Sequence, residues 1–197
     1  AVTSVNQDGQ MVLRYIAADV RNAGRGSQIE GFVQPVVLNL SANNAEGEAV
    51  SFQSTDGGSG GNDTLVVSYL ATSVIDGSLW CSSLRQVGSS FQALSPEAVE
   101  LISGVESFQV LYGVDGNLNN EIGATRYVKA SALAAADSVV AIRLGLLLRT
   151  NDTSLPVPAG SQTLTVLDQS VTTPSDRSVR RVFTTTAQVR NVSWDGI

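Results

Sequence analysis

The sequence predicts an α+β fold, in which one N-terminal amphipathic helix packs on an antiparallel β-sheet. Three observations indicate this fold class. Apolar residues recur at helical spacing near the start of the chain, short apolar segments between turn residues fill most of the remainder, and the length fits a single domain over residues 1–197. One helix followed by a series of strands is the order expected when the helix covers one face of a sheet.

The helix is expected over residues 10–23. Its apolar residues recur at steps of three and four, as they do along one side of a helix. These residues are Met11, Val12, Tyr15, Ile16 and Val20. Asp8 is the expected N-cap, and Gly24 and Gly26 are the expected stop. Because no pattern precedes Asp8, we expect the helix to be cut at its start.

Short apolar segments bounded by Gly, Asn, Asp and Ser predict strands in the rest of the chain. The expected strands cover residues 32–40, 64–71, 79–84, 107–112, 139–149 and 180–192. The second and third are expected to pair across Ile75, Asp76 and Gly77. In the fifth, apolar side chains alternate with others that include Arg143 and Arg149, which predicts one buried and one polar face.

Two connecting segments carry signals of their own. Residues 55–63 are rich in Ser, Gly, Asn and Asp and predict a flexible loop, whose glycines lack the Lys and Ser or Thr of a phosphate-binding loop. Ser95, Pro96 and Glu97 have the order of an N-cap, a first helical proline and an acidic first turn. A short helix is therefore expected over residues 95–101.

Composition excludes several classes of function. The absence of histidine removes Ser-His-Asp and Cys-His catalysis and His-bound zinc. The one cysteine, Cys81, cannot form an internal disulfide or a thiolate cage for a metal. The net charge of −6 gives no general attraction to nucleic acid or anionic lipid, so no nucleic-acid partner is expected.

Carboxylate pairs are the remaining route to catalysis, and their context favours other roles. Glu97 and Glu100 are expected near a helix start, and Glu46 and Glu48 in a loop. No catalytic residue is therefore predicted.

Cys81 and an arginine pair have both structural and functional interpretations. Cys81 is expected to pack beside Trp80 as a small hydrophobic residue, with a lost disulfide or an exposed thiol as alternatives. Arg180 and Arg181 are expected to be charges at a strand edge rather than a ligand clamp.

One spacing resembles a calcium loop. Asp115, Asn117, Asn119 and Glu121 stand at alternate positions, and alternating oxygen ligands wrap Ca²⁺ in such loops. The match is partial, because Asn120 stands where an EF-hand has its turn glycine. These four residues are the candidate metal ligands, calcium is the one cofactor considered, and a polar hairpin turn is the alternative.

Five segments, in order along the chain, carry a family resemblance. They are residues 12–24 (VLRYIAADVRNAG), 62–69 (NDTLVVSY), 101–114 (LISGVESFQVLYGV), 139–149 (VVAIRLGLLLR) and 180–191 (RRVFTTTAQVRN). The first resembles the end of an N-terminal helix, the third and fourth a pair of central strands, and the last a closing strand. Together they resemble the PilW family of type IV pilus minor pilins.

The resemblance implies a pilin-like fold and a role in assembly. Residues 1–26 would be the C-terminal part of the pilin helix and residues 27–197 a β-rich globular head, with the membrane half of the helix missing from this sequence. The protein would be non-catalytic. It would join other minor pilins and the major pilin to prime pilus assembly, with a possible place at the tip.

The resemblance also implies a location. The missing half-helix would hold the protein in the inner membrane of a Gram-negative cell, facing the periplasm, before it joins the pilus at the cell surface. The chain departs from the family at residues 115–121, where members often have an Asp-rich stretch, and in lacking paired cysteines.

Met11, Val12, Tyr15 and Ile16 are the candidate interface residues. The apolar stripe of the helix is wider than one sheet face can cover, and these residues lie toward its start, where the sheet is least expected to reach. We expect them to contact adjacent pilins, and the alternative is that they belong to the core. Two other functions stay open: a J-type pseudopilin of type II secretion, and a calcium-dependent tip adhesin or ligand-binding module that uses residues 115–121.

Overall fold

The computed structural model describes most of the chain. The described residues are 2–22, 37–38, 50–67, 70–87, 90–93, 98–116, 123–134, 137–150 and 158–189. The helix α1 spans Val2–Asn22, and the short 3₁₀ helix η1 spans Ala130–Ala132. The strands are β1 (Val37–Leu38), β2 (Val50–Thr55), β3 (Thr64–Val67), β4 (Leu70–Ile75), β5 (Ser78–Val87), β6 (Ser90–Ala93), β7 (Val99–Ser103), β8 (Val105–Asp115), β9 (Arg126–Val128), β10 (Ser138–Arg149), β11 (Thr163–Val166), β12 (Gln169–Thr172) and β13 (Arg180–Gln188).

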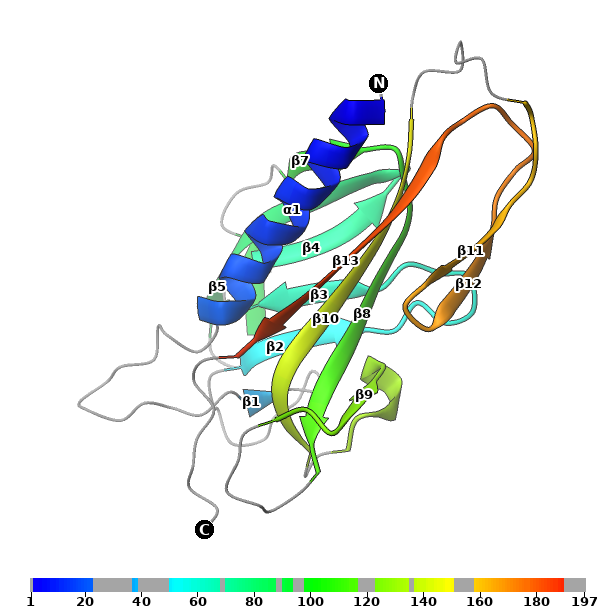
Figure 1. Cartoon of the computed structure of the whole chain (residues 1–197). Coiled ribbons are helices and arrows are strands. Elements are labelled where there is room, and N and C mark those ends of the chain that lie inside the picture. Colours follow the sequence, from blue (N-terminus) through cyan, green and yellow to red (C-terminus); the bar gives the residue numbers. More distant parts are fainter. Residues whose placement is uncertain are drawn as a thin grey trace.

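The described strands form two sheets and a separate hairpin. One sheet has the order β1-β2-β3-β4-β5-β6, with β7 also paired to β5, and the other has the order β13-β10-β8-β9, while β11 pairs with β12. The described pairings are antiparallel except that of β1 with β2. Figure 1 shows α1 lying along the four-stranded sheet beside β13. The expected α+β class, with a helix on an antiparallel sheet, is confirmed.

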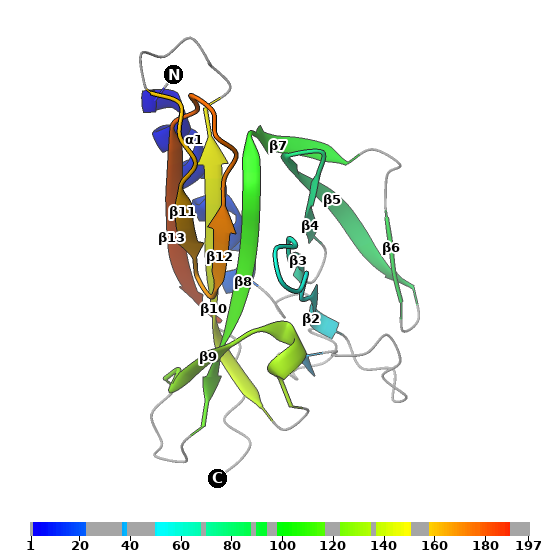
Figure 2. The ribbon, with the colours of Figure 1, turned by 90° about the vertical axis from the view of Figure 1, so that its right-hand side faces the viewer.

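The four-stranded sheet forms the centre of the core because it is covered on both faces. Figure 2 shows α1 behind β10 and β13 and the β11–β12 hairpin in front of them. At Gly145 the hairpin comes so close that a Cβ atom would lie 2.7 Å from Cγ of Leu167. Leu144 and Leu147, whose side chains point to opposite faces of β10, are both fully buried. The polar face expected for this strand is therefore wrong.

The two arginines of β10 lie apart from the core. Arg143 is half-buried, with its guanidinium 3.7 Å from the centre of the Tyr127 ring. Arg149 is exposed at the end of the strand. The arginines thus occupy the parts of the strand that the hairpin leaves uncovered.

The helix α1 starts earlier than its apolar pattern indicates. It already includes Val2, so Asp8 lies inside the helix and its assignment as an N-cap is wrong. Oδ2 of Asp8 accepts a hydrogen bond of 2.8 Å from the Ser4 hydroxyl one turn earlier. The described helix ends at Asn22, one residue before the expected end, while Gly24 and Gly26 lie outside the described residues.

Of two strand predictions in the first sheet, one is wrong and one is confirmed. The single strand expected over residues 64–71 is wrong, because β3 and β4 pair antiparallel with Val67 opposite Leu70. The segment contains neither Gly nor Pro, so its apolar run hides the reversal. The pairing of β4 with β5 is confirmed, and Asp76 and Gly77 both have positive φ, 50° and 71°, as two-residue hairpin turns of type I′ require.

The short helix expected over residues 95–101 is also wrong over residues 99–101, while residues 95–97 lie outside the described part of the chain. Val99, Leu101 and Ile102 belong to β7, which pairs with β5. These residues are favourable in strands, and pairing with an existing sheet outweighs a local helix-start signal. The strands expected at 107–112 and 139–149 are confirmed and are longer. Those at 32–40 and 180–192 are confirmed at 37–38 and 180–188, and their other residues, apart from 189, lie outside the described part of the chain.

Candidate interaction surface of the N-terminal helix

The helix α1 has one face in the core and one face in solvent. The inward residues contact the sheets and are almost completely buried. They are Val12 (3% exposed), Leu13 (3%), Ile16 (1%), Ala17 (1%) and Val20 (0%). On the outward face Met11 is 61% exposed and Tyr15 is 49% exposed. A large apolar residue in solvent marks a surface that a partner could cover.

The four candidate interface residues therefore separate into two pairs. Val12 and Ile16 pack in the core of this domain, so their assignment to a contact with other subunits is wrong. Met11 and Tyr15 are accessible, and their contact with adjacent pilins stays a prediction. The physical reason is helical geometry: Met11 and Val12 are consecutive, so their side chains diverge by about 100° around the axis.

A glycine lets α1 approach the four-stranded sheet closely. A Cβ atom at Gly9 would lie 2.7 Å from Cε2 of Phe183 and 3.0 Å from Cδ1 of Leu148. The sheet thus extends under the first half of the described helix. This contact explains why Val12 is buried although it was expected to lie beyond the reach of the sheet.

One side of α1 is acidic and faces β5 and β7. Asp19 is half-buried there, and burial raises the pKa of its carboxyl above the ordinary value. The pKa of Tyr15 is also raised, first by burial and then by the nearby Asp19 carboxylate. Cys81 on β5 lies under this side, 8% exposed, and burial followed by the Asp19 charge raises the pKa of its thiol. The buried, packed interpretation of Cys81 is confirmed, and an exposed thiol is wrong.

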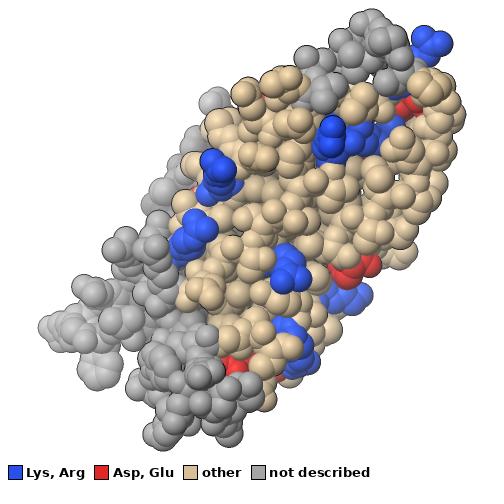
Figure 3. Space-filling model, viewed as in Figure 1, with Lys and Arg blue, Asp and Glu red and all other residues tan. Residues whose placement is uncertain are grey.

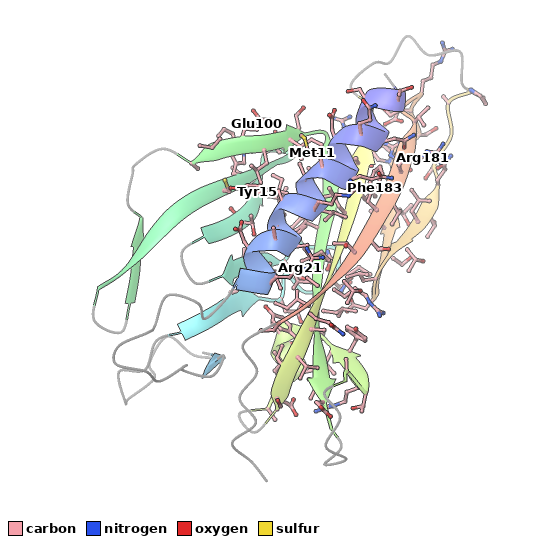
Figure 4. All side chains as sticks on the ribbon, turned by 60° about the vertical axis from the view of Figure 1, so that its left-hand side comes forward. Met11, Tyr15, Arg21, Glu100, Arg181 and Phe183 are labelled. Atoms are coloured by element: carbon pink, nitrogen blue, oxygen red, sulfur yellow. The ribbon has the colours of Figure 1, made fainter. Side chains whose placement is uncertain are left out.

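The other side of α1 is basic and faces β13. Arg14 is exposed and Arg21 is half-exposed, and their spacing of seven residues puts them on the same side of the helix. Arg181 of β13 is exposed and projects from the neighbouring strand (Figure 4). The prediction of interface residues missed these arginines because it followed apolar residues alone. Their seven-residue spacing was the signal that could have found Arg14 and Arg21.

Arg180 has a structural role that differs from that of its neighbour. Its side chain is 1% exposed and donates to both oxygens of Glu106, at 2.6 and 2.9 Å, and to both oxygens of Asp176, at 2.7 Å each. These bonds raise the pKa of Arg180 and hold the pKa of Asp176 far below its usual range. The prediction of a strand-edge charge is wrong for Arg180, while Arg181 is exposed.

The glycine-rich loop of residues 56–63 is tied to the sheet rather than being a free tip. Asp63 is 4% exposed, and its carboxylate accepts hydrogen bonds from the backbone N–H groups of Gly57 (2.9 Å) and Val110 (2.7 Å). Asn62 Oδ1 accepts from the N–H of Phe108 at 2.8 Å. These bonds fasten the loop to β8, so the expected flexible loop is a fixed feature of the fold.

The calcium prediction falls mostly outside the described residues. Of its four candidate ligands only Asp115 is described, and its Oδ2 accepts a hydrogen bond of 3.2 Å from the N–H of Gly123. Asn117, Asn119 and Glu121 lie outside the described residues, so the calcium site stays a prediction. Within the described part of the chain, no group of three or more His, Cys, Asp and Glu side chains could hold a metal ion.

Comparison with known proteins identifies the family. The model of the family described as type IV pilus-assembly protein W matches residues 62–191, which is more than half of the chain. The chain belongs to the PilW family. Its fold is similar to that of a type IV-like pilin from Thermus thermophilus, with a TM-score of 0.54 and 16% sequence identity over 96% of this chain and 97% of that one. No curated protein matches the sequence significantly.

Membership of the PilW family makes the chain a pilin-like component of type IV pilus assembly. The chain is associated with the cell envelope or the pilus, and it interacts with other pilus components. Proteins of this family and fold are generally structural rather than catalytic. The family match starts at Asn62, so α1 is related to pilins through the fold similarity. No helix among the described residues has both the length and the hydropathy to cross a membrane.

Proposed function

We propose that this chain is a minor pilin of the type IV pilus. It joins other minor pilins and the major pilin to prime assembly, without catalysis, and it takes a position at the pilus tip. Before assembly it is held at the inner membrane of a Gram-negative cell, facing the periplasm, by an apolar helix upstream of α1. After assembly it is part of the pilus.

The observation that carries this proposal is the outward face of α1. The inward face of the helix already supplies the core contacts, so Met11 and Tyr15 are not needed to hold α1 on the sheet. A helix fixed along one side with apolar residues on the other can dock against a further subunit. The PilW match and the pilin fold make another pilin the expected occupant.

The proposal is tested by changing this face in cells. We expect the double variant Met11→Asp and Tyr15→Asp, expressed from the native locus, to lose surface pili, because two carboxylates would have to be desolvated in the contact. Pili are counted by electron microscopy and in sheared fractions. Thr165→Asp is the matched control, since Thr165 is exposed on β11, on the other side of the sheet from α1 (Figure 2).

Normal piliation by the double variant, at wild-type protein level, would reject the proposed role. The same strains are assayed for secreted proteins, because loss of secretion with intact pili would instead indicate a J-type pseudopilin. A calcium-dependent adhesin is tested separately by calorimetry of Asp115→Ala against the unchanged chain.

A further inference from the structure

The outward face of α1 lies between two edges of opposite charge. We define the arginine edge as Arg14 and Arg21 of α1 with Arg181 of β13. We define the carboxylate edge as Asp8 of α1 with Glu100 of β7. Met11 and Tyr15 lie between the two edges and form an apolar ridge. Figure 4 shows the ridge and Glu100 on the β7 side and Arg181 on the β13 side.

The positive charges of the arginine edge are available for a contact with a partner. None of its three arginines forms an ion pair with a described residue, in contrast to Arg180, whose two carboxylate partners occupy it fully. Figure 3 shows separate basic patches on this face of the molecule, with uncharged surface between them and little acidic surface. Basic groups on one side without carboxylate partners favour an acidic neighbour.

The carboxylate edge continues onto the neighbouring strand. Asp8 and Tyr15 are seven residues apart and therefore share a side of α1. Glu100 is exposed on β7, beside Val99, which is 61% exposed. Neither Asp8 nor Glu100 pairs with a basic residue in the described part of the chain. An acidic edge with apolar residues beside it thus complements the arginine edge.

We propose that the outward face of α1 is a contact between two copies of this chain, in which the arginine edge of each copy meets the carboxylate edge of the other across the apolar ridge. The inference deepens the proposed function and rests on it for its setting in the pilus. The copies stand face to face with their helices parallel. In an antiparallel arrangement the two arginine edges would meet each other, as would the two carboxylate edges, and like charges at a contact are unfavourable.

The arrangement is consistent with assembly in a pilus, where subunits held by upstream helices share one direction. The ridge supplies burial of apolar surface, and the edges supply the choice of direction. Each edge alone would make a weak contact, because a solvent-exposed ion pair adds little affinity. A second copy is the favoured occupant because the same chain carries both complementary edges.

Charge reversal tests the proposal with purified protein. One variant carries Arg14→Glu, Arg21→Glu and Arg181→Glu, so that both edges are acidic, and the other carries Asp8→Arg and Glu100→Arg, so that both are basic. We expect each variant alone to self-associate at least about tenfold more weakly than the unchanged chain, and their mixture to form a 1:1 pair at least as tight. Both variants keep a negative net charge, so non-specific attraction does not explain pairing. Sedimentation equilibrium at low and high salt measures the association, and circular dichroism confirms folding.

A cysteine placed on the helix tests the direction. Ala18 is exposed and lies one heptad after Met11, so Ala18→Cys should form a disulfide-linked dimer under mild oxidation if the helices are parallel. Cys81 is buried and gives little background. Thr165→Cys, on the opposite side of the sheet, is the control that should stay monomeric.

The outcomes separate this inference from the proposed function. A mixture that fails to pair, or an Ala18→Cys chain that stays monomeric, would overturn the contact between copies. If the charge-reversed variants then also lost pili in cells, the face would belong to a different pilin and the proposed function would stand. Intact pili in cells with the Met11 and Tyr15 double variant would reject the proposed function itself, whatever the purified chains do.

Discussion

The two faces of α1 both carry apolar residues at helical spacing, but they differ in their exposure to solvent and in the contacts that they make. The inward residues are at most 3% exposed and contact both sheets, whereas Met11 and Tyr15 on the outward face are 61% and 49% exposed. Burial of apolar side chains stabilises the fold only on the inward face. The apolar character of the outward face therefore has no role in the isolated domain. A contact surface on a helix can therefore be recognised as the apolar residues that the fold of the single chain leaves exposed.

The largest expected effect is on the inward face. Ile16→Ala should lower the free energy of unfolding by about 4 kcal/mol, because it removes a side chain that is 1% exposed and leaves a cavity between α1 and the sheet. Met11→Ala, one turn away on the outward face, should change it by less than about 0.5 kcal/mol. Urea unfolding followed by circular dichroism measures both.

Similar effects of the two substitutions would contradict the division of α1 into a core face and a contact face. A large loss of stability in Met11→Ala would mean that the outward residue supports the fold of the single chain. It would then be unnecessary to invoke a partner for this surface.

The adjacent arginines of β13 provide the same contrast with charge in place of apolar area. Arg180→Met leaves Glu106 and Asp176 close together without their shared cation and should lower the free energy of unfolding by about 2 kcal/mol, less than for a fully buried pair because both carboxylates are partly solvated. Arg181→Met should have almost no effect on stability, since Arg181 is exposed. Thermal unfolding of the two variants at neutral pH checks this prediction. Equal stabilities would show that the ion pairs of Arg180 contribute nothing net.

The sequence predicts the type of fold well because strong local patterns agree with it. Residues 139–149 form the expected strand, and the turn at Asp76 and Gly77 lies at the position that the sequence predicted for it. Periodicity also located α1, although not its start, because only Val2 and Val5 of α1 are apolar before Asp8, and Val5 packs against the core that the local pattern does not reveal.

The failures concern information that a local pattern does not contain. Which apolar residues of α1 face the core depends on where the sheet lies, so Val12 and Ile16 could not be distinguished from Met11 and Tyr15 by hydrophobicity. The burial of Arg180 depends on Glu106 and Asp176, one of them 74 residues away in the sequence. Residues 99–103 form a strand instead of the expected helix because β5 provides a pairing partner that the local sequence does not reveal.

The smallest expected effect sharpens the boundary between the two faces of α1, where Asp19 lies. Its Oδ2 is buried and accepts no hydrogen bond from a described residue, and burial raises the pKa of the carboxyl above that of the unfolded chain. The folded state therefore binds the proton more tightly than the unfolded state, so the ionised carboxylate opposes folding at neutral pH. That cost is fully present above the folded pKa and disappears as the pH falls below the unfolded value of about 3.9.

Asp19→Asn removes the charge and keeps the size of the side chain. We expect it to raise the melting temperature at neutral pH and to leave it nearly unchanged near pH 3, where the aspartic acid of the unchanged chain is itself neutral. Melting curves at the two pH values make the comparison within one pair of proteins. A lower melting temperature for the variant at neutral pH would mean that the carboxylate is stabilised in the folded chain. Asp19 would then resemble the paired charges of the interior. It would count as part of the core face of α1, and the contact face would begin at residues that are more exposed than Asp19.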